Sequence, residues 1–242
     1  MAASFAKFKE TFIFNFIEGA RWKYITNGLL VTLEVTFFSL LLGIVIGVVV
    51  AMIRSSYDQM KDELPPGPGA TLLKLLDGLS RLYLTVIRGT PVVVQLLIGY
   101  FVIFVSSTNT VFVASMVFGI NSGAYITEII RGGIMSIDHG QFEAGRSIGF
   151  NYFQTMRFII IPQAFKNVLP SLANEFIALL KETAVCGYIG LMDLTKGGDV
   201  IRGRTFTAYM PLLAVALIYL ILVIFFSWLV GKLERRLRSS ER

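Results

Sequence analysis

Long apolar runs alternate with short polar stretches along the chain. Four runs, at residues 25–53, 111–135, 158–180 and 206–231, approach or exceed the roughly 20 residues that an α-helix needs to cross the hydrocarbon core of a membrane. A fifth run, 91–105, is short, and the amphipathic stretch 71–89 before it can lengthen that span. Pro91 lacks a backbone donor, so we expect a kink or break there. The pattern predicts an all-α membrane protein with about five transmembrane helices.

The ends of the chain have a different pattern. Phe5, Phe8, Phe12 and Phe16 recur every three or four residues, which predicts an amphipathic helix lying in the membrane interface over residues 1–20, and no cleavable signal peptide. The proline-glycine turn "LPPGPG" (64–69) separates the first span from the amphipathic stretch that follows it. We therefore expect one transmembrane domain over 21–236, including a polar loop at 137–157, and a basic tail at 237–242.

Composition and charge agree with a membrane protein. Hydrophobic residues make up 55% of the chain and charged residues 16%, against roughly 25% charged in soluble domains. The net charge of +6 is better explained by basic residues at the cytoplasmic ends of spans than by nucleic-acid binding. The cationic end "GKLERRLRSSER" should be cytoplasmic, which places the N-terminus outside after five crossings. One cysteine, Cys186, and one histidine, His139, predict neither a disulfide nor a metal site.

The polar loop at 137–157 is the most informative part of the sequence. Its residues predict a short exposed helix, then a turn near Gly149, then a helix that enters the membrane past Pro162. Simple connectors between helices are usually a few residues long, and this one has about 20. We therefore interpret the loop as a docking surface for a partner protein, although a plain connector is the simpler alternative.

This loop and its flanks resemble a known family. "FEAGRSIGFNYFQTMRFIIIPQA" is similar to the cytoplasmic coupling loop of membrane subunits of ATP-binding-cassette (ABC) importers. Glu143 and Ala144 match the start of the family's Glu-Ala-Ala pattern, Gly149 lies at the expected offset, and Ile161-Pro162 matches the end, while Gly145 departs from the second alanine. Four flanking stretches resemble the polar amino acid subfamily: "GLLVTLEVT" (28–36), "VIRGTPVVVQLL" (86–97), "SGAYITEIIRGGIMSIDHGQFEAG" (122–145) and "IPQAFKNVLPSLANEFIALLKETAV" (161–185).

The resemblance implies a type I ABC importer transmembrane domain, a multi-pass permease subunit in a bacterial cytoplasmic (inner) membrane. The substrate would be a polar or charged L-amino acid, with a basic one weakly favoured. The implied partners are a second permease subunit, identical or homologous, two cytoplasmic ATP-binding subunits and an extracytoplasmic amino acid-binding protein. In this family, a coupling helix docks on the ATP-binding subunit, which implies a coupling role for Glu143, Ala144, Gly145, Arg146, Gly149 and Phe150.

The energy for transport must come from a partner. The chain has no glycine-rich phosphate loop with a following Lys-Ser/Thr, so we expect a non-catalytic subunit without cofactors, whose partner binds ATP and Mg²⁺. A second hypothesis is a self-sufficient, ion-coupled secondary amino acid transporter, which the lack of an inverted repeat disfavours. An intramembrane enzyme would need a Ser/His or paired-Asp constellation that the spans do not contain.

Polar side chains inside the spans predict where the substrate binds. At 1.5 Å per residue, Glu175, Asn121, Glu34 and Gln95 lie between about 12 and 16 Å below the outer ends of four different helices. This shared depth predicts a midplane pocket with Glu175 and Asn121 at its core and Ser122, Gln95 and Glu34 as further candidates. The Glu175 carboxylate would attract a cationic side chain or hold the α-ammonium group of any amino acid. Serine or threonine at such positions can instead make plain helix–helix hydrogen bonds.

Two further polar groups leave alternatives open. Glu128 and Arg131 are three residues apart and share a helix face, so they could form a salt bridge in a gate region. A plain solvated helix end is the favoured interpretation for both. The "KET" sequence (181–183) could belong to an outer gate or contact the binding protein.

Overall fold

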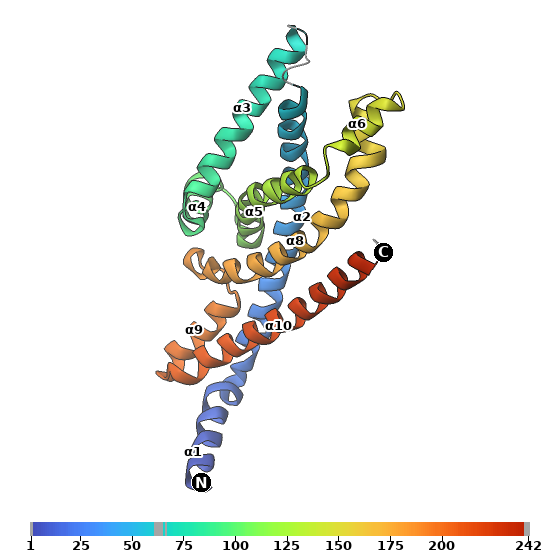
Figure 1. Cartoon of the computed structure of the whole chain (residues 1–242). Helices are drawn as coiled ribbons and strands as arrows, with labels where there is room; N and C mark the ends of the chain where they lie inside the picture. Colours follow the sequence, from blue (N-terminus) through green and yellow to red (C-terminus); the bar gives the residue numbers. More distant parts are fainter. Residues whose placement is uncertain (1, 61–64, 66, 240–242) are drawn as a thin grey trace. The chain divides into compact units, whose positions relative to one another are not determined.

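The computed structural model describes residues 2–60, 65 and 67–239, which form helices and turns without a strand in these ranges (Figure 1). The predicted turn at 64–69 and the tail at 237–242 lie partly outside the described residues. The α-helices are α1 (Ala2–Phe12), α2 (Trp22–Met60), α3 (Pro68–Gly89), α4 (Val92–Ile98), α5 (Thr110–Met135), α6 (Gly140–Ser147), α7 (Tyr152–Thr155), α8 (Ile161–Glu182), α9 (Leu194–Thr205) and α10 (Tyr209–Ser239). Short π- or 3₁₀-helical segments join them: η1 (Ile13–Ile17), η2 (Glu18–Ala20), η3 (Gly99–Ile103), η4 (Met156–Ile160) and η5 (Thr183–Ile189).

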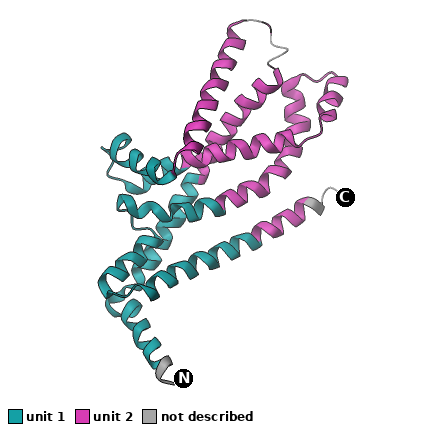
Figure 2. Cartoon of the chain, turned by 60° about the vertical axis from the view of Figure 1, so that its left-hand side comes forward, with its two compact units in different colours: residues 1–39, 92–118, 177–228 teal, residues 40–91, 119–176, 229–242 magenta. Residues whose placement is uncertain are grey.

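The chain divides into two compact units, each assembled from three separate stretches of sequence (Figure 2). Unit 1 contains residues 1–39, 92–118 and 177–228, and unit 2 contains residues 40–91, 119–176 and 229–242. The coupling loop predicted at 137–157 belongs entirely to unit 2. Each unit is described by itself below.

Three of the four long apolar runs form helices that could cross a membrane. In the described residues, α2, α5 and α10 are long and apolar enough to cross a membrane, and α3 with α4–η3 adds a fourth if the pair is one broken span. Thr90 has extended backbone between α3 and α4, which confirms the break expected before Pro91. The helix α8 covers most of the predicted span 158–180 but is not among these, and it carries Lys166, Glu175 and Lys181. The five-crossing topology stays a prediction.

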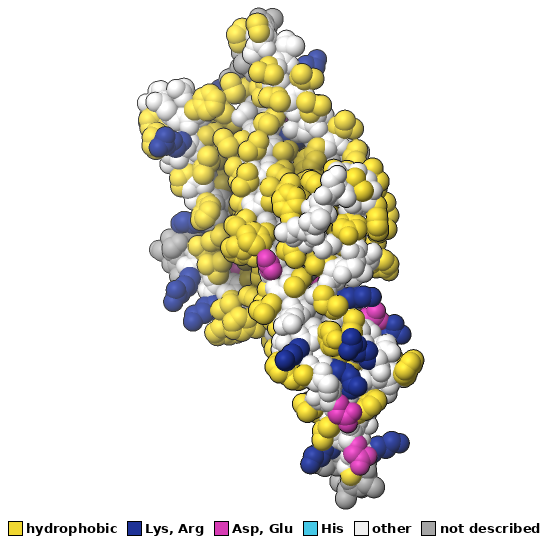
Figure 3. Space-filling view, turned by 180° about the vertical axis from the view of Figure 1, so that it is seen from behind, with side chains coloured by type: hydrophobic (Ala, Val, Ile, Leu, Met, Phe, Trp, Pro, Cys, Tyr) yellow, Lys and Arg dark blue, Asp and Glu magenta, His cyan; other side chains and the backbone are white. Residues whose placement is uncertain are grey.

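The apolar side chains of these helices are widely exposed on the protein surface (Figure 3). On α10, for example, Leu217, Ile221 and Ile224 are each more than half exposed and recur every three or four residues along one helix face. Such contiguous apolar surface marks contact with a partner or with lipid. For a helix of this length and composition, lipid is the expected environment.

Glycines on α2 let α5 pack closely against it in unit 2. A Cβ atom added at Gly43 would lie 3.2 Å from the Ser122 Oγ atom, and one added at Gly47 would overlap Ile126. The two glycines are four residues apart, so they form one small-residue patch on the helix surface. This patch holds α2 against the part of α5 that carries Ser122.

The helix α5 has a matching pair of glycines. A Cβ atom at Gly119 would lie 2.7 Å from the Leu42 side chain, and one at Gly123 would lie 2.9 Å from the Ile46 side chain. Each helix therefore inserts bulky side chains over the glycines of the other. This reciprocal G-x-x-x-G contact is a common way for membrane helices to pack.

Unit 1 contains a helix that the sequence patterns did not predict. The helix α9 covers residues 194–205, and Asp193 caps it by accepting hydrogen bonds from the backbone N–H groups of Thr195 and Lys196, both at 3.1 Å. Burial raises the pKa of the Asp193 carboxyl group, and the two N–H groups oppose this rise. Leu194 and Ile201 of α9 are fully buried, in a cluster with Phe16, Ile25 and Val215. The helix is therefore packed into unit 1.

The N-terminal segment is anchored in unit 1 by a buried amide. Asn15, in η1, is fully buried, and its Oδ1 atom accepts hydrogen bonds from the hydroxyl groups of Thr205 and Thr207. The helical segments α1, η1 and η2 cover residues 2–20, the region of the predicted amphipathic helix. Its location in the membrane interface stays a prediction.

Candidate functional site

The coupling loop folds as the sequence predicted. The short helix α6 is followed by a turn in which Gly149 has a φ of +83°, a conformation that favours glycine. Asn151 and Gln154 then form a reciprocal capping box at the start of α7, which leads through η4 into α8. Because both the turn and the next helix start are fixed by local hydrogen bonds, the loop has a defined shape.

The departure from the family pattern at Gly145 has a local explanation. Gly145 is buried in α6, and a Cβ atom there would lie 2.7 Å from both Cγ2 and Oγ1 of Thr155. An alanine at 145, as the family pattern has, would therefore collide with this threonine. The glycine in α6 and the threonine in α7 form a matched pair that brings the two short helices together.

The remaining predicted coupling residues are largely available to a partner. Glu143, Ala144, Arg146 and Gly149 are exposed, and Phe150 is partly exposed. Glu143 lies in the first turn of α6, with its Oε1 atom 3.5 Å from Nδ1 of His139. Exposed carboxylate and guanidinium groups on one short helix are suited to a docking contact with charged side chains. No contact with a partner tests these six residues, so their coupling role stays a prediction.

A cavity of about 600 Å³ lies between the coupling loop and the end of α2, all within unit 2. Asp58 of α2 lines it opposite Phe142 and Tyr152 of the loop. Burial raises the pKa of the Tyr152 phenol, and a side-chain hydrogen bond with Ser56 of α2 opposes part of this rise. The loop is thereby attached to α2 as well as to its own flanking helices.

The core of the predicted substrate pocket lies in unit 2. The Ser122 hydroxyl group, fully buried on α5, donates a hydrogen bond of 2.8 Å to Glu175 Oε1 on α8. Asn121, the preceding residue, is also buried, with 3% of its surface exposed. The structure thus brings Ser122 and Glu175 into contact from two helices, at a point where Gly43 of α2 packs beside Ser122.

Gln95 and Glu34, the other two candidates, belong to unit 1. Gln95 lies on α4 and is partly buried, whereas Glu34 lies on α2 and is exposed. The structure therefore joins Ser122 and Glu175 by a direct hydrogen bond and places Asn121 next to them in sequence. A pocket that also contains Gln95 and Glu34 stays a prediction.

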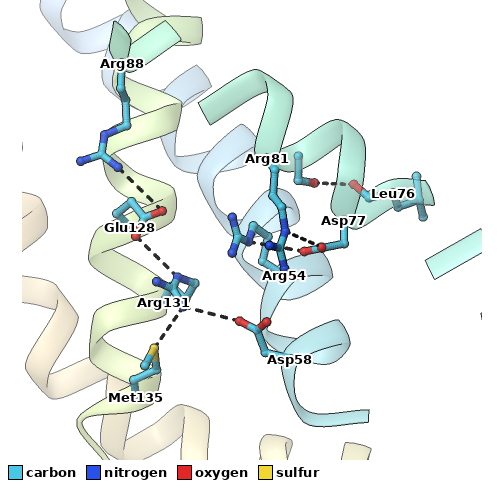
Figure 4. Close-up of polar contacts among 10 residues, drawn as sticks. Arg54, Asp58, Leu76, Asp77, Arg81, Arg88, Glu128, Arg131 and Met135 are labelled. Carbon is cyan, nitrogen blue, oxygen red and sulfur yellow. Dashed lines mark hydrogen bonds and ion pairs between the residues drawn. The ribbon is translucent and has the colours of Figure 1, made fainter. Parts of the chain in front are cut away.

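The favoured interpretation of Glu128 and Arg131 as a plain solvated helix end is wrong. Glu128 Oε2 lies 3.5 Å from Arg131 Nε, and Glu128 Oε1 lies 3.8 Å from Nη1 of Arg88 on α3 (Figure 4). Arg131 Nη1 also lies 3.5 Å from Oδ2 of Asp58 on α2. Partners 40 and 73 residues away in sequence cannot be identified from the spacing within one helix, so the helix pattern alone suggested solvation.

Sequence reasoning also missed the glycine contacts that hold Ser122 in place. The signal was present, because "GIVIG" (43–47) and "GINSG" (119–123) are both G-x-x-x-G motifs inside apolar helices. A motif of this kind marks a close helix contact but does not say which helix is the partner. The structure supplies that partner for both motifs.

Comparison with known proteins agrees with this arrangement. Residues 69–239 match the family model of the binding-protein-dependent transport system inner membrane component. The chain belongs to this family. It is therefore a permease subunit of an ABC importer, with the type I fold, and such subunits work in general with a partner permease, an ATPase and a binding protein. It is an integral membrane protein of the inner membrane. This family membership leaves no support for the ion-coupled secondary transporter.

Several individual proteins are similar over most of their length. The arginine transport system permease protein ArtQ of Bacillus subtilis is 33% identical over 90% of this chain and 94% of its own length. The glutamine transport system permease protein GlnP of Escherichia coli strain K12 is 37% identical over 70% of this chain and 85% of its own. A crystal structure of an amino acid ABC transporter with histidines is 37% identical, with a TM-score of 0.79, and covers 91% of this chain and 98% of that one.

Proposed function

We propose that this permease subunit carries a polar or basic L-amino acid across the membrane, and that the amino acid binds at Glu175, Ser122 and Asn121. The observation that supports this most directly is the hydrogen bond between the buried Ser122 hydroxyl group and the Glu175 carboxylate. A carboxylate and an amide held among apolar helices are rare and are retained for ligands or helix contacts. The similar permeases are named for arginine and glutamine, and the similar crystal structure is of an amino acid transporter with histidines.

The chemistry of these groups fits the part that all amino acids share. Glu175 can accept hydrogen bonds from an α-ammonium group, and the Asn121 amide can donate to an α-carboxylate. The cationic side chain of arginine, lysine or histidine could occupy the Glu175 position instead, which keeps basic substrates within the class. Gln95 and Glu34, which helix geometry predicts at a similar depth, are proposed as further candidates for contact with the substrate.

The functional unit needs further chains. We infer that it contains a second permease subunit, identical or homologous, two cytoplasmic ATP-binding subunits that dock on the exposed face of α6, and an external binding protein that delivers the amino acid. In this arrangement the N-terminus lies outside and the C-terminus in the cytoplasm. ATP and Mg²⁺ would be bound by the ATP-binding subunits and not by this chain.

The test removes only the charge of Glu175. In the purified complex, Glu175→Gln should weaken stimulation of ATP hydrolysis by the amino acid-loaded binding protein, with a half-maximal amino acid concentration at least about tenfold higher, because a charge-assisted contact is lost. Glu18→Gln makes the same change at an exposed position and should have no effect. Unchanged stimulation in Glu175→Gln would place the substrate elsewhere.

A further inference from the structure

Seven charged side chains of unit 2 form two groups of ion pairs, one of three residues and one of four (Figure 4). We refer to them as the arginine network, because four arginines face three carboxylates. They come from the three helices α2, α3 and α5. Its members are Arg54 and Asp58 of α2, Asp77, Arg81 and Arg88 of α3, and Glu128 and Arg131 of α5.

The group of three is built around a buried carboxylate, Asp77. Asp77 is 3% exposed, and its carboxylate accepts a hydrogen bond of 2.7 Å from Arg81 Nε and lies 3.5 Å from Arg54 Nε. Removing a partner of a buried carboxylate reduces the compensation of its charge, which is unfavourable. We therefore regard the connection of α3 to α2 through Asp77 and Arg54 as permanent.

The group of four is more exposed to solvent. The side chains of Arg131 and Asp58 are 25% and 35% exposed, and their closest approach is 3.5 Å. Arg131 Nε is buried and has no hydrogen-bond partner, although Glu128 Oε2 lies within ion-pair distance of it. Partly hydrated ion pairs contribute little to stability, so water can replace either partner at small cost. The contact of α5 with α2 through Arg131 is therefore suited to repeated breaking.

Arg131 occupies a particular place along α5. Ser122, which bonds to Glu175, lies nine residues before it on the same helix, about 13 Å away at 1.5 Å per residue. Four residues after Arg131, α5 ends at Met135, and the coupling helix α6 begins at Gly140. One continuous helix thus carries the pocket residue and the arginine, and leads directly to the coupling loop.

We propose that the ion pair between Arg131 and Asp58 is a latch, closed in one state of the transport cycle and open in another, and that Arg131 is the positioning residue through which movement of the coupling loop reaches Ser122. The inference rests on the proposed function, because it assigns the step that links the coupling loop to the pocket. When the latch opens, Arg131 keeps Glu128, on its own helix, and Asp58 is hydrated. Neither charge is then left without compensation.

The latch can be tested by reversible cross-linking. The only cysteine, Cys186, is buried, so cysteines introduced by Asp58→Cys and Arg131→Cys can be joined selectively with a short bifunctional thiosulfonate. In the complex with its ATP-binding subunits, the cross-linking rate should differ at least about fivefold between the nucleotide-free and the ATP-trapped states. Cross-linking should lower amino acid-stimulated ATP hydrolysis below that of the same double-cysteine complex before cross-linking, and reductant should return it to that level. Equal rates in the two states, or full stimulation after cross-linking, would overturn the proposal.

A double-mutant cycle gives a second measurement that does not depend on cysteine chemistry. Asp58→Asn and Arg131→Gln should each lower the ratio of stimulated to basal ATP hydrolysis, and the double variant should be no worse than either single one, because all three open the same latch. Lys74→Gln removes an exposed charge of α3 outside the network and should leave the ratio unchanged. Additive losses in the double variant would contradict the latch.

The two proposals can fail separately. The comparison of cross-linking rates between nucleotide states needs no amino acid, so it tests the latch even if the substrate class is wrong. If the unmodified complex responds to no amino acid-loaded binding protein, the proposed substrate class fails. If it responds normally and the rates are equal, only the latch fails.

Discussion

A methyl group added at Gly197 would overlap the carbonyl oxygen of Tyr24, whereas one added at Gly203, on the same helix α9, would meet nothing within 4 Å. A side chain is therefore excluded at Gly197 and sterically allowed at Gly203. At Gly197 the absence of a side chain lets α9 lie against the start of α2. At Gly203 the glycine only lowers helix stability, by about 0.5–1 kcal/mol relative to alanine.

We predict that Gly197→Ala lowers the thermal stability of the purified complex, because overpacking of this kind costs about 1–3 kcal/mol. Gly203→Ala should leave the melting temperature unchanged or raise it slightly. The measurement is the melting temperature in detergent, followed by the intrinsic fluorescence of the complex. A Gly197→Ala variant as stable as Gly203→Ala would show that α9 does not pack on α2 as described.

At the scale of single residues, the sequence predicted a role correctly where the role depends on neighbouring residues in the chain. The residues of the loop predicted a turn near Gly149, and the positive φ of this glycine confirms the prediction. Gly197 could not be singled out among the 22 glycines, because its neighbour Tyr24 is 173 residues away. A glycine required by a distant backbone has the same sequence signature as one that is merely tolerated.

At the scale of helices, the pairing of α6 with α7 makes a sharp prediction for the coupling loop. Gly145→Ala should push the two helices apart, because the new Cβ atom meets Thr155 at 2.7 Å, and should reduce amino acid-stimulated ATP hydrolysis. Adding Thr155→Ala removes both colliding atoms and should restore most of the stimulation. If the single variant is fully active, or the double variant is no better than the single one, the docking surface does not depend on this contact.

The pairing of α2 with α5 makes a second prediction. Gly119→Ala should force α5 away from Leu42, whereas Gly132→Ala, also on α5, has open space around it. We expect Gly119→Ala to reduce the yield of assembled complex in a size-exclusion profile and Gly132→Ala to leave it unchanged. Equal yields would argue against the reciprocal glycine contact.

The sequence patterns predicted these elements better than their contacts. The apolar runs matched α2, α5, α8 and α10, and Pro91 predicted the break between α3 and α4. The helix α9 was missed because its glycines and charged residues weaken the helical pattern. Contacts of the buried Leu194 and Ile201 with residues of other segments stabilise this helix. The arginine network was missed for a related reason, since periodicity gives the face of a helix but not its partner.

At the scale of the whole molecule, this chain is one subunit of a larger transport complex. One set of helices cannot enclose a pathway that opens alternately on the two sides of the membrane, so a second permease is needed. The residues of the candidate site differ in how far this single chain defines their contacts. Contact between Ser122 and Glu175 is internal to unit 2, whereas the shared depth of Gln95 and Glu34 was a prediction from helix geometry that depends on how the complete assembly is arranged.

The central claim is that the coupling loop transmits the energy of ATP hydrolysis to the amino acid pathway. The most direct measurement is uptake of labelled glutamine and arginine by vesicles containing the assembled complex, with the binding protein outside and ATP inside. We predict ATP-dependent uptake of at least one of them. In Gly149→Val, uptake should fall at least about tenfold, because a β-branched residue strongly disfavours positive φ, while Ile148→Val should transport normally. Undiminished uptake by Gly149→Val, or uptake by this chain alone under an ion gradient, would contradict the account.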